Sequence, residues 1–307
     1  MVEIYEILDS AYVTGRDVAE LFTNQKDVIV DWQEVQGDKG KTDFIKIIIK
    51  GTNGFSKGGS APTLGIVGRL GGIGARPDIT GLVSDADGAV AALACALKLT
   101  SMKSKGDSLS GDVIITTHIC PDAPTRPHIP VPFMDSPVDM IEMNKYEIDL
   151  NMDAILSVDT TKGNRLLNHK GIAISPTVKE GYILPVSKDL LEITEIVTGK
   201  SSVVLPITTQ DITPYGNGLY HINSILQPAV ATDAPVAGVA ITAETAVPGC
   251  ATGASHIGDI DAAARFCIEV AKRFGKRECA FYNQHEFDKM VKLYGSMKHL
   301  QTLGKTH

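Results

Sequence analysis

Acidic and imidazole side chains occur at several places along this chain, in or just beyond the loops that follow runs of apolar residues. They are Asp85, Asp87, His118, Asp122, Asp159 and His256. Carboxylate oxygens and imidazole nitrogens together suit Zn, Mn or Co, and a catalytic metal site draws its ligands from distant loops. The residue types and their placement therefore predict a site for a divalent metal ion.

The elements that precede these residues explain how they could meet. Continuous apolar or β-branched runs, typical of strands covered on both faces, occupy residues 63–67, 112–117, 154–158, 202–205 and 236–242. Helix patterns occupy residues 87–99, 188–197 and 259–274. This alternation predicts an α/β fold of three layers, in which a mostly parallel central sheet carries helices on both faces. Ligands of such sheets bind outside the carboxyl ends of the strands, so we expect the six side chains to meet at that edge.

Both ends of the chain carry further patterns. Residues 28–35 and 43–50 predict two strands joined around GDKG. Residues 285–303 predict a C-terminal amphipathic helix that caps the fold or meets a partner. No repeat or linker interrupts the sequence, so we interpret residues 1–307 as a single α/β domain.

The composition argues against several classes of function. Basic residues number 29 and acidic residues 36, and no stripe of Lys and Arg could neutralise a run of phosphates. We therefore expect no nucleic-acid partner. No apolar run reaches the length of a membrane span, and MVEIYEILDS at the start lacks the pattern of a signal peptide. Five scattered cysteines without a CxxC pair are typical of reduced thiols, so we expect a cytoplasmic protein that binds no membrane.

Three segments resemble the co-catalytic zinc exopeptidase superfamily, whose aminopeptidases and deacylases share a phosphorylase-like α/β fold. SDADGAVAALACALKL is similar to its bridging aspartate and Ala-rich helix, DAILSVDTT to its strand ending in a ligand Asp, and GASHIGDID to its late ligand His. The resemblance extends over roughly residues 60–275. It implies that Asp85 bridges two metals and that Asp159 and His256 are ligands.

The chain departs from this superfamily at two places. Arg69, in GRLG, stands where the superfamily has the His of a His-x-Asp motif, and HICPD (118–122) stands where it has paired glutamates. With one His replaced, we expect a single ion, zinc or else Mn or Co, held by a subset of Asp85, Asp87, His118, Asp159 and His256. Asp122 is then the candidate general base for the metal-bound water, whose pKa a metal brings to about 7. His118 is the second candidate catalytic residue.

The stretches GRLGGIGARP, SDADGA and THICPDAPTRPH also resemble a bacterial family known as domain of unknown function 1177. That resemblance implies no mechanism. The glycines of the first stretch do not form a dinucleotide-binding loop, because Pro77 stands where the third glycine is required.

Each candidate residue also has a structural interpretation. Asp85 and Asp87 could cap the helix that follows them, because the free N–H groups of a helix start favour Asp. Asp159 could form a turn with two threonines, and His256 could be an ordinary residue at a helix start. Prolines follow His118 closely, so that segment could be a rigid structural loop.

Three functions fit these patterns. The leading hypothesis is a metal-dependent, aminopeptidase-like hydrolase of a small peptide or N-acyl amide bond. The second is an amidohydrolase with Cys120 as nucleophile and His118 or His256 as base. The third is a metal-free member without catalysis, which binds an amino-acid-like ligand through the carboxylate anchors Arg69 and Arg76. In each case the partner is a small peptide or amino-acid-like molecule, and the apolar runs are compatible with a homo-oligomer as well as a monomer.

Overall fold

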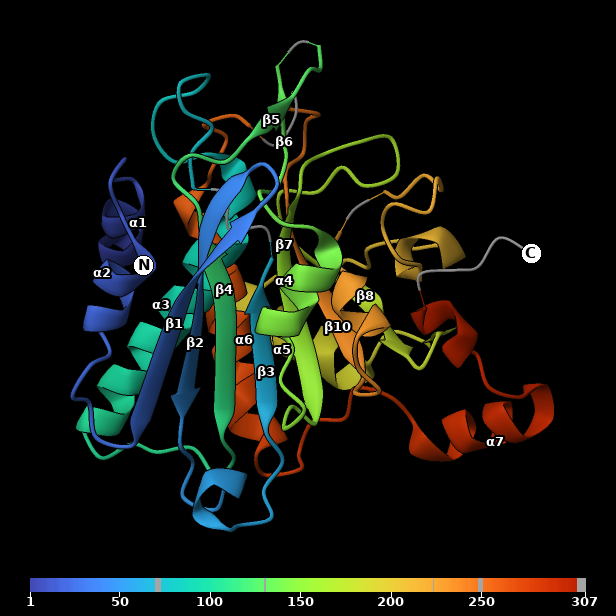
Figure 1. The fold of residues 1–307 in the computed structure, drawn as a ribbon. Coiled ribbons are helices and arrows are strands. Elements are labelled where there is room, and N and C mark those ends of the chain that lie inside the picture. Colours follow the sequence, from blue (N-terminus) through green and yellow to red (C-terminus); the bar gives the residue numbers. More distant parts are fainter. Residues whose placement is uncertain (70–72, 130, 223, 248–250, 303–307) are drawn as a thin grey trace.

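The structure is a computed structural model and describes residues 1–69, 73–129, 131–222, 224–247 and 251–302. Eight strands form its central sheet (Figure 1): β1 Val28–Gly37, β2 Gly40–Ile49, β3 Leu64–Gly68, β4 Val113–Ile119, β7 Ala154–Thr161, β8 Gly171–Lys179, β9 Tyr182–Ile183 and β10 Val236–Thr242. Their order in the sheet is β1-β2-β4-β3-β7-β10-β8-β9. Two short strands, β5 Thr125–Arg126 and β6 Phe133–Met134, pair separately.

Parallel pairing is concentrated at the centre of the sheet. Strands β4, β3, β7 and β10 are parallel neighbours, whereas β1, β2, β8 and β9 pair antiparallel at the two edges. The tight GDKG turn forces β1 and β2 to be antiparallel, since parallel neighbours need a long crossover. The predicted α/β fold is confirmed, as a mixed sheet whose four central strands all end at one edge.

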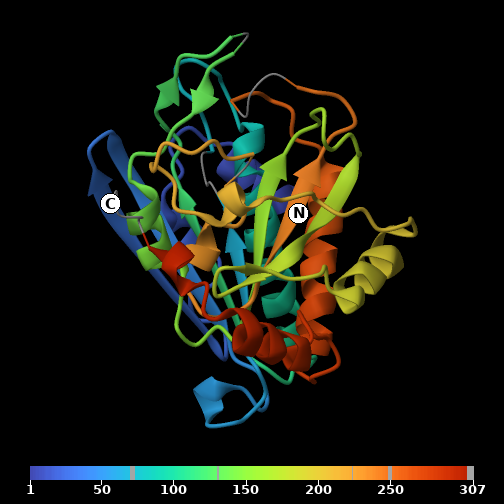
Figure 2. The same ribbon diagram turned by 90° about the vertical axis from the view of Figure 1, so that its right-hand side faces the viewer.

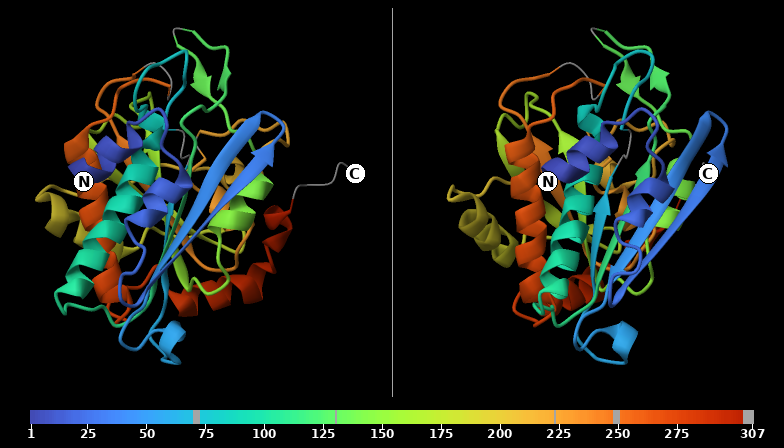
Figure 3. Two further views of the ribbon diagram at one scale, coloured as in Figure 1. Left: turned by 60° about the vertical axis from the view of Figure 1, so that its left-hand side comes forward. Right: turned by 90° about the vertical axis from the view of Figure 1, so that its left-hand side faces the viewer.

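Helices cover both faces of the sheet. The long helices α3 (Asp87–Ser104) and α6 (Ile257–Phe274) lie side by side on one face, with α1 (Val2–Leu8), α2 (Gly15–Glu20) and α5 (Lys188–Thr198) around them (Figure 3). Helix α4 (Met140–Glu147) lies on the opposite face, across β2 and β4 (Figure 2). Helix α7 (Gln284–Tyr294) packs on β9, where the rings of Phe287 and Tyr182 meet edge to face at 5.9 Å.

The apolar core lies on both faces because alternate strand residues point to opposite sides. Ile66 of β3 and Val158 of β7 belong to the cluster under α3 and α6. Val67 and Ile155, which lie in the same two strands at positions of the opposite parity, belong to the cluster on the α4 face. Both faces are therefore apolar, and each central strand is buried over its whole length apart from Thr160.

Close contact between α3 and the sheet depends on small residues. A Cβ atom on Gly88 would lie 2.4 Å from the carbonyl oxygen of Val158, which no real side chain tolerates. Glycine at this position lets the first turn of α3 approach the end of β7. The start of α3 is thereby brought to the carboxyl edge of the central strands.

Most predicted elements are present, with three differences. Residues 202–205 form no extended strand and contribute one bridge, between Val204 and Ile174. The predicted helix over 285–303 is shorter, because α7 ends at Tyr294 before Gly295 and a separate 3-10 turn covers Lys298–Gln301. Helices α1 and α4 and strands β5, β6, β8 and β9 were not predicted. No helix in the described ranges is long and apolar enough to cross a membrane, and the interpretation of the chain as one domain stays a prediction.

Candidate active site at the carboxyl edge of the sheet

A buried network lies between the sheet and α4. Arg69, directly after β3, donates through Nη1 to Glu147, the last residue of α4, and its other end contacts the sulfur of Met140. The second carboxylate oxygen of Glu147 lies 2.8 Å from Nδ1 of His118 in β4. The side chains of Arg69 and Glu147 have no exposed surface. Burial favours the neutral acid, but the charge of Arg69 and the hydrogen bond to His118 hold the pKa of Glu147 below its usual value.

Asp159 lies on the same face, in the neighbouring strand β7. Its Oδ2 accepts a 2.6 Å hydrogen bond from the hydroxyl of Ser224. Burial raises the pKa of Asp159 to about 6, although Ser224 and the charge of Arg69 favour the ionised form. Burial and then the Asp159 carboxylate raise the pKa of Tyr215, whose ring stacks on His221 at 4.4 Å. Tyr215 and Ser224 therefore both lie near the Asp159 carboxylate.

A second group of side chains lies at the start of α3. Asp87, which is fully buried, accepts a 2.5 Å hydrogen bond from the hydroxyl of Ser255 at Oδ1 and forms a 3.0 Å ion pair with Lys162 at Oδ2. Burial raises the pKa of Asp87, while Lys162, Ser255 and His256 act to lower it. Nδ1 of His256 is buried and has no hydrogen-bond partner among the described residues. These four residues, Asp87, Lys162, Ser255 and His256, are called the rim cluster below.

Backbone and hydroxyl contacts hold the rim cluster at the edge of the sheet. The hydroxyl of Thr160, in β7, donates to the carbonyl oxygen of Ser84 at 2.5 Å. The amide of Ser84 in turn donates to the carbonyl oxygen of Thr252 at 2.7 Å. The end of β7, the turn before α3 and the loop before α6 are thus joined, although they lie far apart in sequence.

The predicted metal ligands divide between these two groups. His118 and Asp159 belong to the network under α4, whereas Asp87 and His256 belong to the rim cluster. Asp85 is buried in the 3-10 turn Ser84–Ala86, just before α3. Within the part of the chain that the structure describes, no three His, Cys, Asp or Glu side chains are placed to hold one metal ion.

The residues therefore do not fit the predicted metal centre, and the physical reason is visible in the contacts. Asp87 already engages a lysine, and Glu147 already engages an arginine. A metal ion needs several ligand atoms aimed at one point, with none of them held by a competing cation. Among the described residues no subset of the five predicted ligands is gathered at one point, and their role as ligands stays a prediction.

The other predicted residues are placed as follows. Arg69 forms its ion pair with Glu147 and has no exposed surface, so its role as an anchor for a substrate carboxylate stays a prediction. Arg76 donates to the carbonyl oxygens of Pro121 and Asp9, at 3.1 and 3.0 Å. Both predicted substrate anchors thus bind groups of the protein itself.

Two further residues proposed from HICPD, Asp122 and Cys120, differ in exposure. Asp122 is exposed, and its backbone pairs with Ala75 in an isolated bridge. Its role as general base stays a prediction. Cys120 is buried, and burial raises the pKa of its thiol to about 12. Burial therefore disfavours Cys120 as nucleophile, because the thiolate is the reactive form of a cysteine. Its role in catalysis stays a prediction.

The sequence did not single out several residues of these groups, among them Glu147, Lys162, Ser224 and Ser255. A signal for Glu147 exists in the sequence. It occupies the last position of the helical stripe Met140, Met143, Asn144 and Glu147, spaced i, i+3, i+4 and i+7, and a charge on an apolar stripe indicates a buried partner. Lys162 directly follows the predicted strand end, but a lysine in a loop carries no sequence signal of burial.

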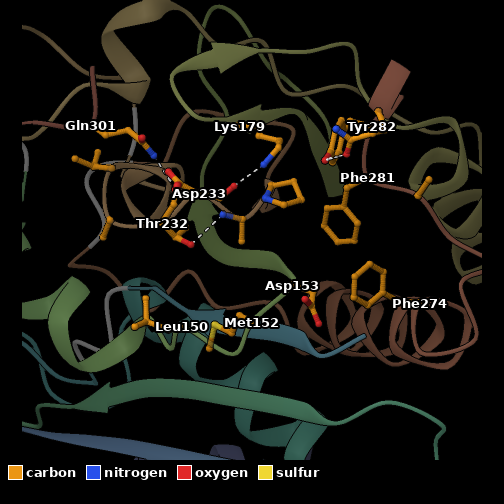
Figure 4. Close-up of a pocket in the computed structure, with 16 residues that line it drawn as sticks. Leu150, Met152, Asp153, Lys179, Thr232, Asp233, Phe274, Phe281, Tyr282 and Gln301 are labelled. Carbon is orange, nitrogen blue, oxygen red and sulfur yellow. Dashed lines mark hydrogen bonds between the residues drawn. The ribbon is translucent and has the colours of Figure 1, made fainter. Parts of the chain in front are cut away.

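An open groove of about 790 Å³ lies elsewhere, at the amino ends of the same strands (Figure 4). Met152, Phe274 and Phe281 contribute apolar surface, and Asp153 immediately precedes β7. Its charged groups serve the fold: Asp153 accepts from the amide of Thr63 at 2.8 Å, and Lys179 donates to the carbonyl oxygen of Asp233 at 2.7 Å. This groove is therefore not the candidate active site.

The fold is that of aminopeptidase-like α/β proteins. A mutant of tomato leucine aminopeptidase is similar to this chain with a TM-score of 0.50 and 12% identity, over 87% of this chain and 60% of that protein. LapA aminopeptidase from Legionella pneumophila is similar with a TM-score of 0.44 and 11% identity, over 91% of this chain and 65% of that protein. The chain thus spans less than two thirds of either protein. The likeness to the tomato protein concerns the fold.

By sequence, the chain belongs to the family described as "Protein of unknown function (DUF1177)", which matches residues 33–304. No curated protein is significantly similar to it. The family resemblance noted from the sequence is thus confirmed, and the distant likeness to exopeptidases is consistent with the fold.

Proposed function

We propose that this protein hydrolyses an amide bond in a small peptide or N-acyl amino acid, and that the reaction takes place at the rim cluster. The aminopeptidase-like fold supports this substrate class, and the carboxyl edge of parallel strands is where such folds bind ligands. The cytoplasm as its location is part of the same proposal, supported by the four described cysteines, which are all free thiols.

The observation that carries the proposal is the buried carboxylate of Asp87. Each of its oxygens engages one donor, Ser255 at 2.5 Å and Lys162 at 3.0 Å, so its orientation is fixed. Burial raises its pKa, which brings the carboxylate closer to the proton affinity that a general base needs at neutral pH. A carboxylate serving only as a helix cap would instead accept from the backbone N–H groups of the first turn.

Within this proposal Asp87 accepts the proton of the attacking group and returns it to the leaving amine. Lys162 keeps Asp87 ionised before the reaction and supplies positive charge beside the reacting carbonyl group. The N-terminus of α3, an 18-residue helix, adds a favourable field for negative charge at the same place. His256, with Nδ1 uncommitted, is a second group that could exchange a proton there.

A divalent metal was the first expectation from the sequence, and Zn, Mn and Co are the ions to test. The described residues do not fit such a centre, so the proposed chemistry uses the protein's own groups and contains no metal step. A homo-oligomer stays a prediction as well.

A second candidate function is binding without turnover. The ion pair of Lys162 with Asp87 favours it, because paired charges of opposite sign can rearrange to hold the amino and carboxylate groups of an amino acid. A ligand would then raise the melting temperature without being consumed.

One experiment tests the hydrolase against the binding protein. The purified chain is incubated with aminoacyl anilides, dipeptides and N-acetyl amino acids, and released amine and melting temperature are both measured. We expect amine release, and we expect Asp87→Asn to lower kcat by a factor of about 10²–10⁴, the usual contribution of a general base. Asp107→Asn, at an exposed position beyond α3, is the matched control and should be unchanged.

The contrary results are equally clear. A well-folded wild-type chain that releases no amine from any of these substrates contradicts the hydrolase. A raised melting temperature in the same samples then supports the binding protein. Full activity in Asp87→Asn would leave a hydrolase whose site lies elsewhere.

A further inference from the structure

We infer that Ser255 is the nucleophile of this reaction and carries the acyl group of the substrate as a transient ester. The inference rests on the proposed function, since it names the attacking group of that same site. Serine hydroxyls attack carbonyl groups when a neighbouring base removes their proton. The geometry of the rim cluster provides this arrangement.

The first argument is the chain of contacts through Asp87. The hydroxyl of Ser255 donates to Oδ1 of Asp87 at 2.5 Å, and Lys162 donates to the other oxygen at 3.0 Å. A nucleophile in hydrogen-bond contact with a base, and a third group that orients the base, is the arrangement that activates serine in unrelated hydrolases. Here Ser255 is the nucleophile, Asp87 is the base, and Lys162 orients the base.

The second argument is that local structure does not explain the Ser255 hydroxyl. It lies two residues before α6, and the N-cap of that helix is His256, which makes no side-chain capping bond. Serine near a helix start usually caps it. The Ser255 hydroxyl instead reaches a buried carboxylate 168 positions away in sequence.

The third argument is exposure. Asp87 is fully buried, and the side chain of Lys162 is only 7% exposed, whereas Ser255 is half-buried. Ser255 therefore stands between the buried base and the surface. A substrate carbonyl can approach the hydroxyl while the base stays shielded from water, which strengthens its interactions with charge.

The reaction that follows is balanced without any added reagent. Ser255 Oγ bonds to the amide carbon as its proton passes to Asp87. The C–N bond then breaks, and the nitrogen leaves as an amine with the proton from Asp87. Water next attacks the ester, Asp87 takes one proton from the water and returns it to Ser255 Oγ, and the carboxylic acid is released.

Labelling with a fluorophosphonate tests the inference without a known substrate, because this reagent captures activated serine hydroxyls. The native chain is treated at pH 8, and intact mass and peptide mapping locate the adduct. We expect one adduct, on Ser255. Ser255→Ala should lose both the adduct and amide hydrolysis, and Asp87→Asn should label at least about 100-fold more slowly.

Two further variants keep the test independent of folding. Ser255→Cys retains a nucleophile. Iodoacetamide should modify position 255 of this variant faster in the native chain than in the denatured chain, as measured by peptide mapping. Ser104→Ala, an exposed serine at the far end of α3, is the matched control and should label as the wild type does.

The outcomes separate the two proposals. Hydrolysis that persists in a folded Ser255→Ala chain overturns the nucleophile and leaves the proposed function standing. An adduct on Ser255 in a chain that cleaves no amide supports the nucleophile and contradicts the amide substrate class. A native chain without an adduct on Ser255 overturns the inference.

Discussion

Arg69 and Glu147 form an ion pair in which neither side chain has any surface exposed to solvent. The pair joins the end of β3 to the last residue of α4, and Glu147 also binds His118 of β4 at 2.8 Å. Removing charges from water costs several kcal/mol per ion, which only a complete set of partners offsets. The network therefore stabilises the fold only as long as all of its members are present.

Single substitutions in this pair should be severe. Glu147→Gln and Arg69→Met should each lower the free energy of unfolding by about 3–5 kcal/mol, because each leaves a buried charge uncompensated. The double variant should cost less than the sum of the two. Urea unfolding measures all three, and Glu20→Gln, which breaks the exposed pair with Arg16, should change stability by less than about 1 kcal/mol. Additive losses in the double variant would show that the two charges are not coupled.

Asp159 gives a pH dependence whose sign can be worked out. Its pKa is about 6 in the folded chain against an ordinary 3.8, so the folded state binds the proton more tightly than the unfolded state. The stabilisation is therefore complete below pH 4 and is lost as the pH rises through 6, by about 3 kcal/mol for two pKa units. Asn cannot titrate.

The difference in unfolding free energy between wild type and Asp159→Asn should accordingly change by about 2–3 kcal/mol between pH 4 and pH 8, to the disadvantage of the wild type. Asp38→Asn, in the exposed turn between β1 and β2, is the control. A constant difference across this range would mean that Asp159 has an ordinary pKa.

Much of the fold could be predicted because the central strands appear in the sequence as continuous apolar and β-branched runs. The β-branched runs before His118 and Asp159 end where β4 and β7 end, give or take a few residues. The rule that ligands collect at strand ends placed most candidate residues at the carboxyl edge of the sheet, and the structure has them there. Sequence also located Asp87 and His256, two of the four residues of the rim cluster.

The partners of these residues could not be predicted. Arg69 meets Glu147 across 78 positions, and Ser255 meets Asp87 across 168, and no local periodicity encodes such contacts. The split into two groups was also hidden. Both faces of the central strands are apolar. A strand of this kind shows no alternation of polar and apolar residues, so its sequence does not reveal that Asp159 points to the α4 face.

The buried thiol of Cys120 predicts slow alkylation. With a pKa of about 12, very little thiolate exists at pH 8, and burial further restricts access. Iodoacetamide should therefore modify Cys120 in the native chain at least about 100-fold more slowly than in the urea-unfolded chain, as followed by peptide mass spectrometry. Rapid native modification, together with loss of amide hydrolysis, would restore the cysteine mechanism.

Internal cations predict a chain that needs no metal for its stability. Lys162 and Arg69 neutralise Asp87 and Glu147, so the acids are compensated before any ion arrives. A site that Zn, Mn or Co filled at 100 times its dissociation constant would stabilise the folded chain by about 2.7 kcal/mol. We expect no such rise in the free energy of unfolding on adding these ions, no fall with a chelator, and less than about a tenth of an equivalent of bound metal after purification.

Lys162→Ala is the informative variant, because it removes the competing cation from Asp87 beside His256. If a metal raises the melting temperature of that variant alone, the Lys162 ammonium group occupies the position that a metal ion would otherwise take. The same rise in the wild type would contradict a site that works without metal.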